Sequence, residues 1–329
     1  MEYRALGASD LKVSVIAFGA WAIGGVMWGG ADEAKAVEAI RASVDVGVTT
    51  LDTAYLYGFG ASERLVGKAV AGIRDRVQIL TKFGLRENYG QGEYFFDLQD
   101  QGNAYPIYRI ATKKSIMEEC ERSLRDLGTD YIDLYQCHWR DHTTSVEETA
   151  EAMATLIKQG KIRAAGVSNF TAEEIEAANK IVPIASNQPP YSMVERGIES
   201  DVLPWCREHN IGIIVYSPMQ RGLLTGKFDP NHKFARDDHR ADAVHFKPEN
   251  IRRVNAFLKG LEPIAEEHNA TLGQVVLNWT IQQPGVTAAL VGARDAAQAR
   301  DNAAAANFRL TAKEIQDINQ RLGELKLER

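Results

Sequence analysis

Short apolar runs alternate with longer amphipathic stretches along most of the chain. The runs are rich in apolar and β-branched residues and are bounded by Gly, Asp, Asn or Ser, which is typical of buried strands. In Lys113–Leu127, apolar residues recur at helical spacing with charged residues between them. The pattern predicts eight strands, at Val15–Gly19, Thr49–Asp52, Val77–Lys82, Tyr131–His138, Ala164–Ser168, Ala185–Gln188, Gly212–Tyr216 and Ala288–Val291. It predicts helices at Glu33–Val46, Lys113–Leu127, Val146–Lys158 and Ile251–Glu267.

Strands that alternate with helices indicate an α/β protein with a parallel sheet. Eight such units in a chain of this length predict a closed (β/α)₈ TIM barrel. Residues 3–14, with a turn at Ala8–Asp10, predict a β-hairpin that closes the bottom of the barrel. A last helix is expected at Thr311–Leu322, where Thr311 and Glu314 have the spacing of a capping box. No low-complexity linker interrupts the chain, so we expect one domain over residues 1–329.

Two long segments do not fit the repeat and are predicted to be loops. Asn88–Ile110 contains three glycines and several aromatic residues, and Asp229–Pro248 contains three histidines among mixed charges. Both follow predicted strands, so both should cover the C-terminal mouth of the barrel. Loops of this length in a compact domain are usually functional or disordered.

Composition narrows the class of protein. The chain has 329 residues, 45% of them hydrophobic, and a net charge of −6 that is spread along its length. Without a basic stripe, nucleic acid is not an expected partner. The three cysteines are far apart, and no apolar run is long enough to span a bilayer or to serve as a signal peptide. A cytoplasmic globular enzyme or binding protein, with no membrane partner, is expected, and the number of subunits stays open.

Four chemically capable residues fall at predicted strand ends, where barrel enzymes keep their active sites. Asp52 and Lys82 end the second and third strands, Tyr57 follows in a loop, and His138 ends the fourth strand. Each has an ordinary structural explanation, as a helix cap, a solvated strand end, a packed ring or a core histidine. All four at one mouth favour a catalytic site.

Four other patterns resemble functional motifs but do not match them. Gly222–Lys227 resembles a phosphate-binding P-loop, but it has three residues between its glycines and Phe228 after the lysine. Gly58–Glu63 begins like a dinucleotide fingerprint without its third glycine, which argues against a Rossmann site. The histidines of Asp229–Pro248 are six or seven residues apart with no cysteine nearby, so we expect a solvated loop and no metal. Cys137 should pack outside the barrel because its neighbour His138 faces the other way.

Several motifs, in order, together resemble the aldo-keto reductase superfamily. They are Leu51–Gly58 followed by Ser62-Glu63 and Gly67, then Thr81-Lys82, Asp133–Trp139 and Gly166–Phe170. Tyr216-Ser217-Pro218 and Arg221–Lys227 are similar to the branch that includes bacterial general-stress reductases and potassium-channel β subunits. The resemblance implies an oxidoreductase that interconverts a small-molecule carbonyl and its alcohol, in which Tyr57 donates a proton and Lys82 lowers the pKa of Tyr57. Asp52 would orient Lys82, and His138 would orient the substrate oxygen or help to relay the proton.

The same resemblance implies a nicotinamide cofactor, with NADPH preferred to NADH because Arg294 matches the position that meets the ribose 2′-phosphate. Gln298 stands where many relatives have a second arginine. The implied cofactor contacts are Trp21, Asp52, Ser168, Asn169, Gln188, Tyr216, Ser217, Pro218, Met219, Gln220, Arg221, Gly222, Lys227, Arg240, Gly292, Arg294, Gln298, Asp301 and Asn302.

The substrate is not identified by the sequence. Substrate contacts are expected from Trp21, Trp28, Tyr57, His138 and Trp139, with Met27, Tyr89, Phe95 and Phe96 nearby. Sugars, keto acids, aromatic aldehydes and quinone-like carbonyls all stay open. Two other functions also stay open: a nicotinamide-binding regulatory module with little turnover, and a metal-dependent barrel hydrolase, for which no ligand cluster is present.

Overall fold

A closed barrel of eight parallel strands forms the centre of the computed structural model, which describes residues 1–28, 30–100, 102–234 and 238–328. The strands follow one another around the barrel in chain order, β3-β4-β5-β9-β10-β11-β12-β13. Their bounds are β3 Ile16–Gly19, β4 Thr50–Asp52, β5 Gln78–Phe83, β9 Ile132–Cys137, β10 Ile162–Ser168, β11 Ile184–Gln188, β12 Gly212–Val215 and β13 Val286–Val291. Each coincides with a predicted strand to within about two residues, so the predicted (β/α)₈ barrel is confirmed.

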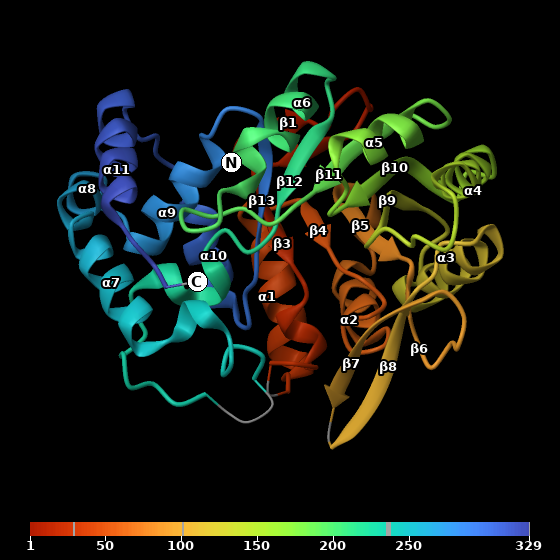
Figure 1. Cartoon of the computed structure of the whole chain (residues 1–329), viewed down its shortest axis with the longest axis horizontal. Coiled ribbons are helices and arrows are strands. Elements are labelled where there is room, and N and C mark those ends of the chain that lie inside the picture. The colour runs from red at the N-terminus through yellow and green to blue at the C-terminus, as the bar shows by residue number, and fades with distance from the viewer. Residues whose placement is uncertain (29, 101, 235–237, 329) are drawn as a thin grey trace.

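Helices surround the barrel (Figure 1). Their inner faces are apolar and pack on the outward-facing side chains of the strands, which merges helices and barrel wall into one buried cluster. The helices are α1 Glu33–Asp45, α2 Ala61–Val70, α3 Lys113–Leu127, α4 Val146–Lys158, α5 Ala172–Asn179, α6 Val202–Glu208, α7 Pro248–Lys259, α8 Glu262–Glu267, α9 Leu272–Ile281, α10 Ala296–Ala304 and α11 Ala312–Glu324.

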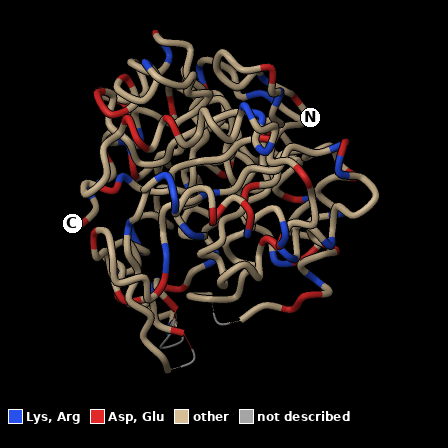
Figure 2. Tube along the Cα trace, turned by 90° about the vertical axis from the view of Figure 1, so that its right-hand side faces the viewer, with Lys and Arg blue, Asp and Glu red and all other residues tan. Residues whose placement is uncertain are grey.

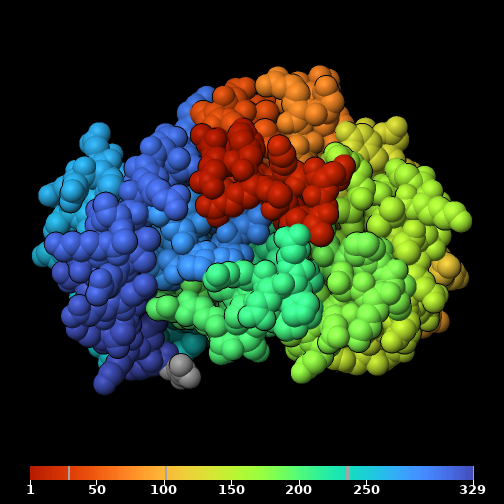
Figure 3. All heavy atoms as spheres, turned by 90° about the horizontal axis from the view of Figure 1, so that it is seen from above, coloured from red at the N-terminus to blue at the C-terminus, as the bar shows by residue number. Residues whose placement is uncertain are grey.

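The predicted hairpin closes the N-terminal end of the barrel. Strands β1 (Tyr3–Ala5) and β2 (Lys12–Ser14) pair antiparallel. Leu6, Leu11 and Val13 are fully buried and join the apolar interior of the barrel. Figure 3 shows the N-terminal segment, in red, lying across this end of the molecule. The other end of the barrel is therefore the one left for a binding site.

The segment predicted as the first long loop is instead mostly strand. β6 (Leu85–Glu87), β7 (Glu93–Asp100) and β8 (Asn103–Arg109) form a three-stranded antiparallel sheet in the order β6-β8-β7. Figure 1 shows β7 and β8 extending beyond the barrel. Their alternating large side chains stabilise this sheet by cross-strand pairs such as Tyr94 opposite Tyr108. The prediction of a loop was wrong because its glycines mark turns and not an unstructured segment.

The long helix expected at Ile251–Glu267 is broken in two, as α7 and α8. The break falls at Gly260–Leu261, and Pro263 lies in the first turn of α8, where its missing amide donor costs no helical hydrogen bond. At the end of the chain, Thr311 and Glu314 form the predicted capping box of α11. The second long loop, Asp229–Pro248, includes positions 235–237, which lie outside the described residues.

Charged residues are distributed without segregation into a basic face. Figure 2 shows Lys and Arg interspersed with Asp and Glu along the chain. Within the described residues, none of the helices has both the length and the apolar character needed to cross a bilayer.

Candidate active site

The barrel brings the four predicted catalytic residues to its C-terminal mouth. Asp52 is the last residue of β4, Lys82 lies near the end of β5, and His138 directly follows β9. Lys82 Nζ lies 2.5 Å from Asp52 Oδ1 and 3.2 Å from the Tyr57 hydroxyl, and it also donates to the Thr53 carbonyl at 3.0 Å. The Tyr57 and His138 rings meet edge to face, with their centroids 5.9 Å apart. One ammonium group thus connects a carboxylate to a phenol.

The Asp52–Lys82 ion pair is almost completely removed from solvent, with side chains 2% and 1% exposed. A buried charge pair persists only if its remaining polar atoms are also satisfied. Asp52 Oδ2 accepts from the side-chain amides of Gln188 at 2.9 Å and Gln136 at 3.3 Å, and these two amides bond each other at 3.1 Å. Gln136 lies within the Asp133–Trp139 motif, but its role could not be inferred from the sequence, because its contact with Asp52 crosses the barrel interior.

Burial and charge set the protonation of this cluster. Burial raises the pKa of Tyr57, and the Lys82 ammonium opposes this rise without reversing it. Burial lowers the pKa of Lys82, but Asp52 and Tyr57 outweigh it, so Lys82 stays charged. Burial, followed by repulsion from Lys82, holds the pKa of His138 well below its ordinary value. At neutral pH the site therefore presents a neutral phenol, a neutral imidazole and a charged lysine.

A cavity of about 810 Å³ opens in front of these residues. It is lined by Tyr57, His138 and Asp52, while Lys82 lies behind them. Of the residues expected to contact a cofactor, those that line the cavity are Trp21, Asp52, Ser168, Asn169, Gln188, Tyr216, Ser217, Pro218, Met219, Arg221, Gly222, Lys227, Arg240, Gly292, Arg294, Gln298, Asp301 and Asn302. Gln220 does not line it, since its side chain is buried against His245.

A hydrogen-bonded chain fixes one wall of the cavity. The Tyr216 hydroxyl donates to Asn169 Oδ1 at 2.9 Å, and Asn169 Nδ2 donates to the His138 carbonyl at 3.1 Å. Ser168 Oγ donates to the Gln188 carbonyl at 2.7 Å. Asn169 adopts a positive φ of 61°, which a non-glycine residue adopts at a cost in free energy. The wall is therefore preorganised around Tyr57 before any ligand binds.

In the loop after β12, several residues between Ser217 and Gly222 have strained backbone conformations. Ser217, Gln220 and Arg221 have φ values of 56°, 44° and 55°, and Gly222 follows with 95°. Strained backbone of this kind clusters at ligand-binding segments, where the surrounding structure holds it in place. Burial lowers the pKa of Arg221, and the nearby Arg240 charge contributes to this lowering. The loop thus places two guanidinium groups together beside the cavity.

Aromatic side chains surround the mouth near Tyr57. Trp21, Trp28, Trp139 and the hairpin residues Phe95 and Phe96 line it, together with Met27. The indole Nε1 of Trp28 is buried and has no acceptor among the described residues, so it is available to a ligand. Tyr89 lies outside the cavity, beneath the Arg86 guanidinium at 4.0 Å, contrary to the expectation that it helps to select the substrate.

The sequence suggested that His239 lies in a solvated loop, but in the structure its side chain is buried. Its side chain is 8% exposed and its ring packs on Trp21 and Trp28, with centroid distances of 4.9 Å to each. Its Nδ1 lies 2.9 Å from the Met27 carbonyl. No group of histidine, cysteine or carboxylate side chains in the described part of the chain has a metal-binding arrangement. The segment after β12 therefore covers the mouth through His239.

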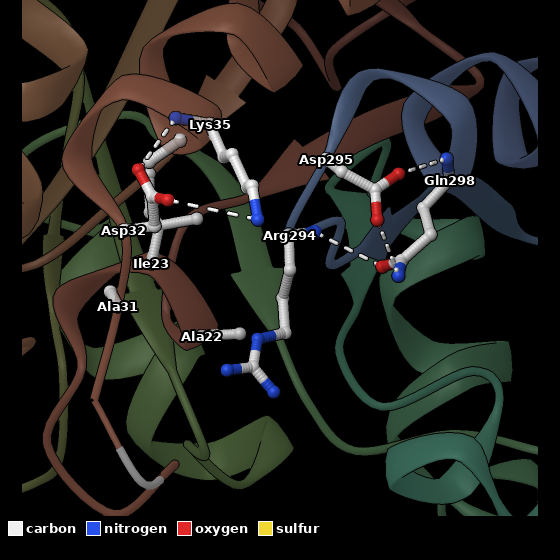
Figure 4. Close-up of a pocket in the computed structure, with 9 residues that line it drawn as sticks. Ala22, Ile23, Ala31, Asp32, Lys35, Arg294, Asp295 and Gln298 are labelled. Atoms are coloured by element: carbon white, nitrogen blue, oxygen red, sulfur yellow. Dashed lines mark hydrogen bonds and ion pairs between the residues drawn. The ribbon is translucent and has the colours of Figure 1, made fainter.

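The far end of the cavity is more open and more polar. Arg294 lies in the turn between β13 and α10, and among the described residues its guanidinium hydrogen-bonds the Gly30 carbonyl alone, at 3.4 Å. Gln298 accepts from the Arg294 amide and donates to Asp295. Figure 4 shows Arg294 between the start of α1 and Gln298. The Asp301 carboxylate accepts a hydrogen bond from the Gln274 side chain, and the Asn302 side chain donates to the Gly292 carbonyl.

These residues fit a nicotinamide dinucleotide. One cavity connects Tyr57 to Arg294, and within the described residues the cavity-lining cations Arg221, Lys227 and Arg294 have no ion-pair partner. Unpaired cations along a cleft suit the phosphate groups of such a cofactor. The apolar wall near Tyr57 suits the ring that reacts.

The barrel, the cluster of Asp52, Tyr57, Lys82 and His138, and the long cleft together define an aldo-keto reductase. The model of the Aldo/keto reductase family matches residues 15–322, so the chain belongs to this family. It is an oxidoreductase that acts on carbonyl compounds, in a family that uses a nicotinamide cofactor.

Named relatives cover nearly the whole chain. The chain is 38% identical to aldo-keto reductase YhdN of Bacillus subtilis, over 97% of this chain and 93% of that protein. It is 34% identical to the NADH-specific methylglyoxal reductase of Escherichia coli, over 94% of this chain and 95% of that one. Among solved structures, the glycerol dehydrogenase AKR11B4 from Gluconobacter oxydans superposes with a TM-score of 0.88 at 36% identity, covering 98% of this chain and 95% of that chain.

Proposed function

We propose that this protein is an NADPH-dependent oxidoreductase that interconverts a small carbonyl compound and its alcohol, with Tyr57 as the proton donor. The observation that carries the proposal is the contact of 3.2 Å between the Lys82 ammonium and the Tyr57 hydroxyl, at the wall of the cavity. The names of two relatives, a methylglyoxal reductase and a glycerol dehydrogenase, support chemistry on small carbonyls and alcohols.

The protein's own part in the reaction is proton transfer and positioning. The bound nicotinamide supplies the two electrons and the hydrogen that go to the carbonyl carbon. Tyr57 gives its phenolic proton to the carbonyl oxygen, and the Lys82 ammonium stabilises the phenolate that remains. Asp52 keeps Lys82 charged and aimed at Tyr57. Neutral His138 holds the same substrate oxygen by a hydrogen bond. Its ring nitrogens are free for this, since they have no hydrogen-bond partner among the described residues.

The choice of cofactor is the finer part of the proposal. Arg294 faces the adenosine end of the cleft with a nearly unengaged guanidinium, which suits a 2′-phosphate. Ser168, Asn169 and Gln188, which line the cavity beside Tyr57, would hold the nicotinamide carboxamide, Tyr216 would pack on its ring, and the segment from Ser217 to Lys227 would bind the pyrophosphate. Because one relative is NADH-specific, measured affinities for both cofactors decide this point. We place the enzyme in the cytoplasm, because its three buried free cysteines suit a reducing compartment.

The decisive experiment replaces Tyr57 by Phe, which removes only the hydroxyl. Turnover of a generic aldehyde with NADPH should fall by roughly 10²–10⁴-fold, the usual range for loss of a general acid. Cofactor affinity, followed by nicotinamide fluorescence, should stay within about twofold of the wild type, because the ring that lines the cavity is retained. Wild-type turnover in this variant would exclude Tyr57 as the donor. Negligible turnover in the wild type, with intact cofactor binding, would favour a regulatory module.

A further inference from the structure

A second, smaller pocket adjoins the adenosine end of the cleft. It has a volume of about 270 Å³ and lies between the beginning of α1 and the beginning of α10 (Figure 4). It shares Ala22, Arg294 and Gln298 with the large cavity, so it is a side compartment of the cofactor cleft. Lys35 and Asp32 of the α1 region form its opposite wall.

In this compartment the carboxylates of Asp32 and Asp295 have firm hydrogen bonds, whereas the ammonium of Lys35 and the guanidinium of Arg294 have only weak contacts. Asp32 Oδ1 caps α1 by accepting from the Lys35 amide, and Asp295 caps α10 by accepting from the Gln298 amide. The Lys35 ammonium, in contrast, lies 3.7 Å from Asp32 on a side chain that is 66% exposed. Such an exposed pair is weak and readily exchanged. The Lys35 ammonium and the Arg294 guanidinium can therefore both bind an anion placed between them.

The polar neighbour Gln298 cannot supply a further charge. Its side-chain oxygen accepts from the Arg294 amide at 3.1 Å, and its Nε2 donates to Asp295 at 2.9 Å. A phosphate monoester carries nearly two negative charges at neutral pH, more than one guanidinium neutralises. Besides Arg294, the cation among the described residues that line the compartment is Lys35.

We propose that Lys35 is a specificity-determining residue. Its ammonium exchanges Asp32 for the 2′-phosphate of the cofactor and serves there as the second cation, opposite Arg294. The inference rests on the proposed use of NADPH and extends it to the first helix. The flexible stem of lysine allows this change of partner, which a planar, bidentate arginine makes less easily. Asp32 competes with the phosphate for Lys35 and so limits the preference for NADPH.

The test measures binding separately from turnover. Dissociation constants are determined for adenosine 2′,5′-bisphosphate and adenosine 5′-monophosphate by calorimetry, and for NADPH and NADH by fluorescence. Lys35→Met should weaken binding of the two 2′-phosphorylated ligands by about threefold to tenfold and the other two by less than about twofold. Lys35→Arg should retain most of the affinity. Asp32→Asn, which keeps the cap acceptor and removes the competing charge, should tighten the 2′-phosphorylated ligands by a similar factor.

The matched control is Lys114→Met, on α3 far along the chain, where an exposed lysine also lies near a carboxylate. It should change none of the four constants. Equal losses for ligands with and without a 2′-phosphate in Lys35→Met, or unchanged constants, would overturn the role of Lys35 even if the wild type reduces carbonyls with NADPH. Conversely, a Lys35-dependent affinity for adenosine 2′,5′-bisphosphate in a protein without turnover would support this inference and contradict the proposed function.

Discussion

The two ends of the cofactor cleft hold their charges in opposite ways. At the catalytic end, Asp52 and Lys82 are buried, and every polar atom of the pair has a partner in the protein. At the adenosine end, Lys35 is mostly exposed and, among the described residues, the guanidinium of Arg294 hydrogen-bonds one carbonyl alone, at 3.4 Å. The Asp52–Lys82 pair is thus satisfied by the protein itself, whereas the cations of the adenosine end have weak contacts that a phosphate could replace.

This difference matches what each end has to do. Proton transfer requires a fixed distance between Lys82 and Tyr57, and a buried network maintains it. Recognition of a phosphate requires cations that can leave their present partners at little cost. The comparison therefore predicts large, salt-insensitive effects from changes at the buried end and smaller, salt-sensitive effects from changes at the open end.

The largest effect is expected on stability. Asp52→Asn would leave the Lys82 ammonium buried without its counter-charge, which should lower the free energy of unfolding by about 3–5 kcal/mol. Asp32→Asn, the matched change at the open end, should cost less than about 1 kcal/mol. Urea unfolding followed by circular dichroism measures both. Similar losses in the two variants would show that burial does not distinguish the two ends.

Lys82→Met tests whether the buried charge also controls proton transfer. Burial already raises the pKa of Tyr57, and removal of the opposing ammonium should raise it further. Alcohol oxidation requires Tyr57 as phenolate, the form that decreases as its pKa rises. Oxidation at neutral pH should therefore fall by at least about 10²-fold, with residual activity that grows as the pH increases. Steady-state oxidation rates across pH, with cofactor affinity measured separately, provide the check. A wild-type pH profile would make Lys82 a structural residue.

The strands and the catalytic end were predictable from the sequence for a physical reason. Buried parallel strands produce short apolar runs that stand out from amphipathic helices, and residues at their ends share one mouth of the barrel. Their positions at the ends of parallel strands are enough to bring Asp52, Lys82 and His138 together. Their partner Gln136 could not be found in this way, because its role depends on a contact across the barrel interior.

The covering segments were harder to predict. The hairpin of β7 and β8 is stabilised by pairing with β6 and by packing on loops at the mouth that are distant in sequence, so its periodicity is not shared with the barrel strands. His239 is buried only because the chain folds back on Trp21 and Trp28, more than two hundred residues away. Likewise, the break between α7 and α8 depends on a single turn at Gly260, within an apolar pattern that continues across it.

Arg294→Ala examines the open end directly. Loss of a charge-assisted hydrogen bond to the 2′-phosphate should weaken NADPH binding by about 1.5–3 kcal/mol. NADH lacks this group, so its affinity should change by less than about 0.5 kcal/mol. Fluorescence titration with both cofactors measures the two effects. Equal losses would mean that Arg294 contributes to the shape of the cleft and does not read the phosphate.

Salt should separate the two ends without any change in sequence. Mobile ions screen exposed charges over about 10 Å at 0.1 M ionic strength and about 3 Å at 1 M, whereas a buried pair is screened much less. Between about 0.05 and 0.5 M sodium chloride, the affinity for NADPH should fall several-fold and that for NADH by a smaller factor. Over the same range, the difference in unfolding free energy between the wild type and Asp52→Asn should change by less than about 0.5 kcal/mol. Titrations and unfolding curves at matched salt concentrations test this. An NADPH affinity that does not respond to salt would place the phosphate-binding cations in a protected site and would remove the contrast between the two ends.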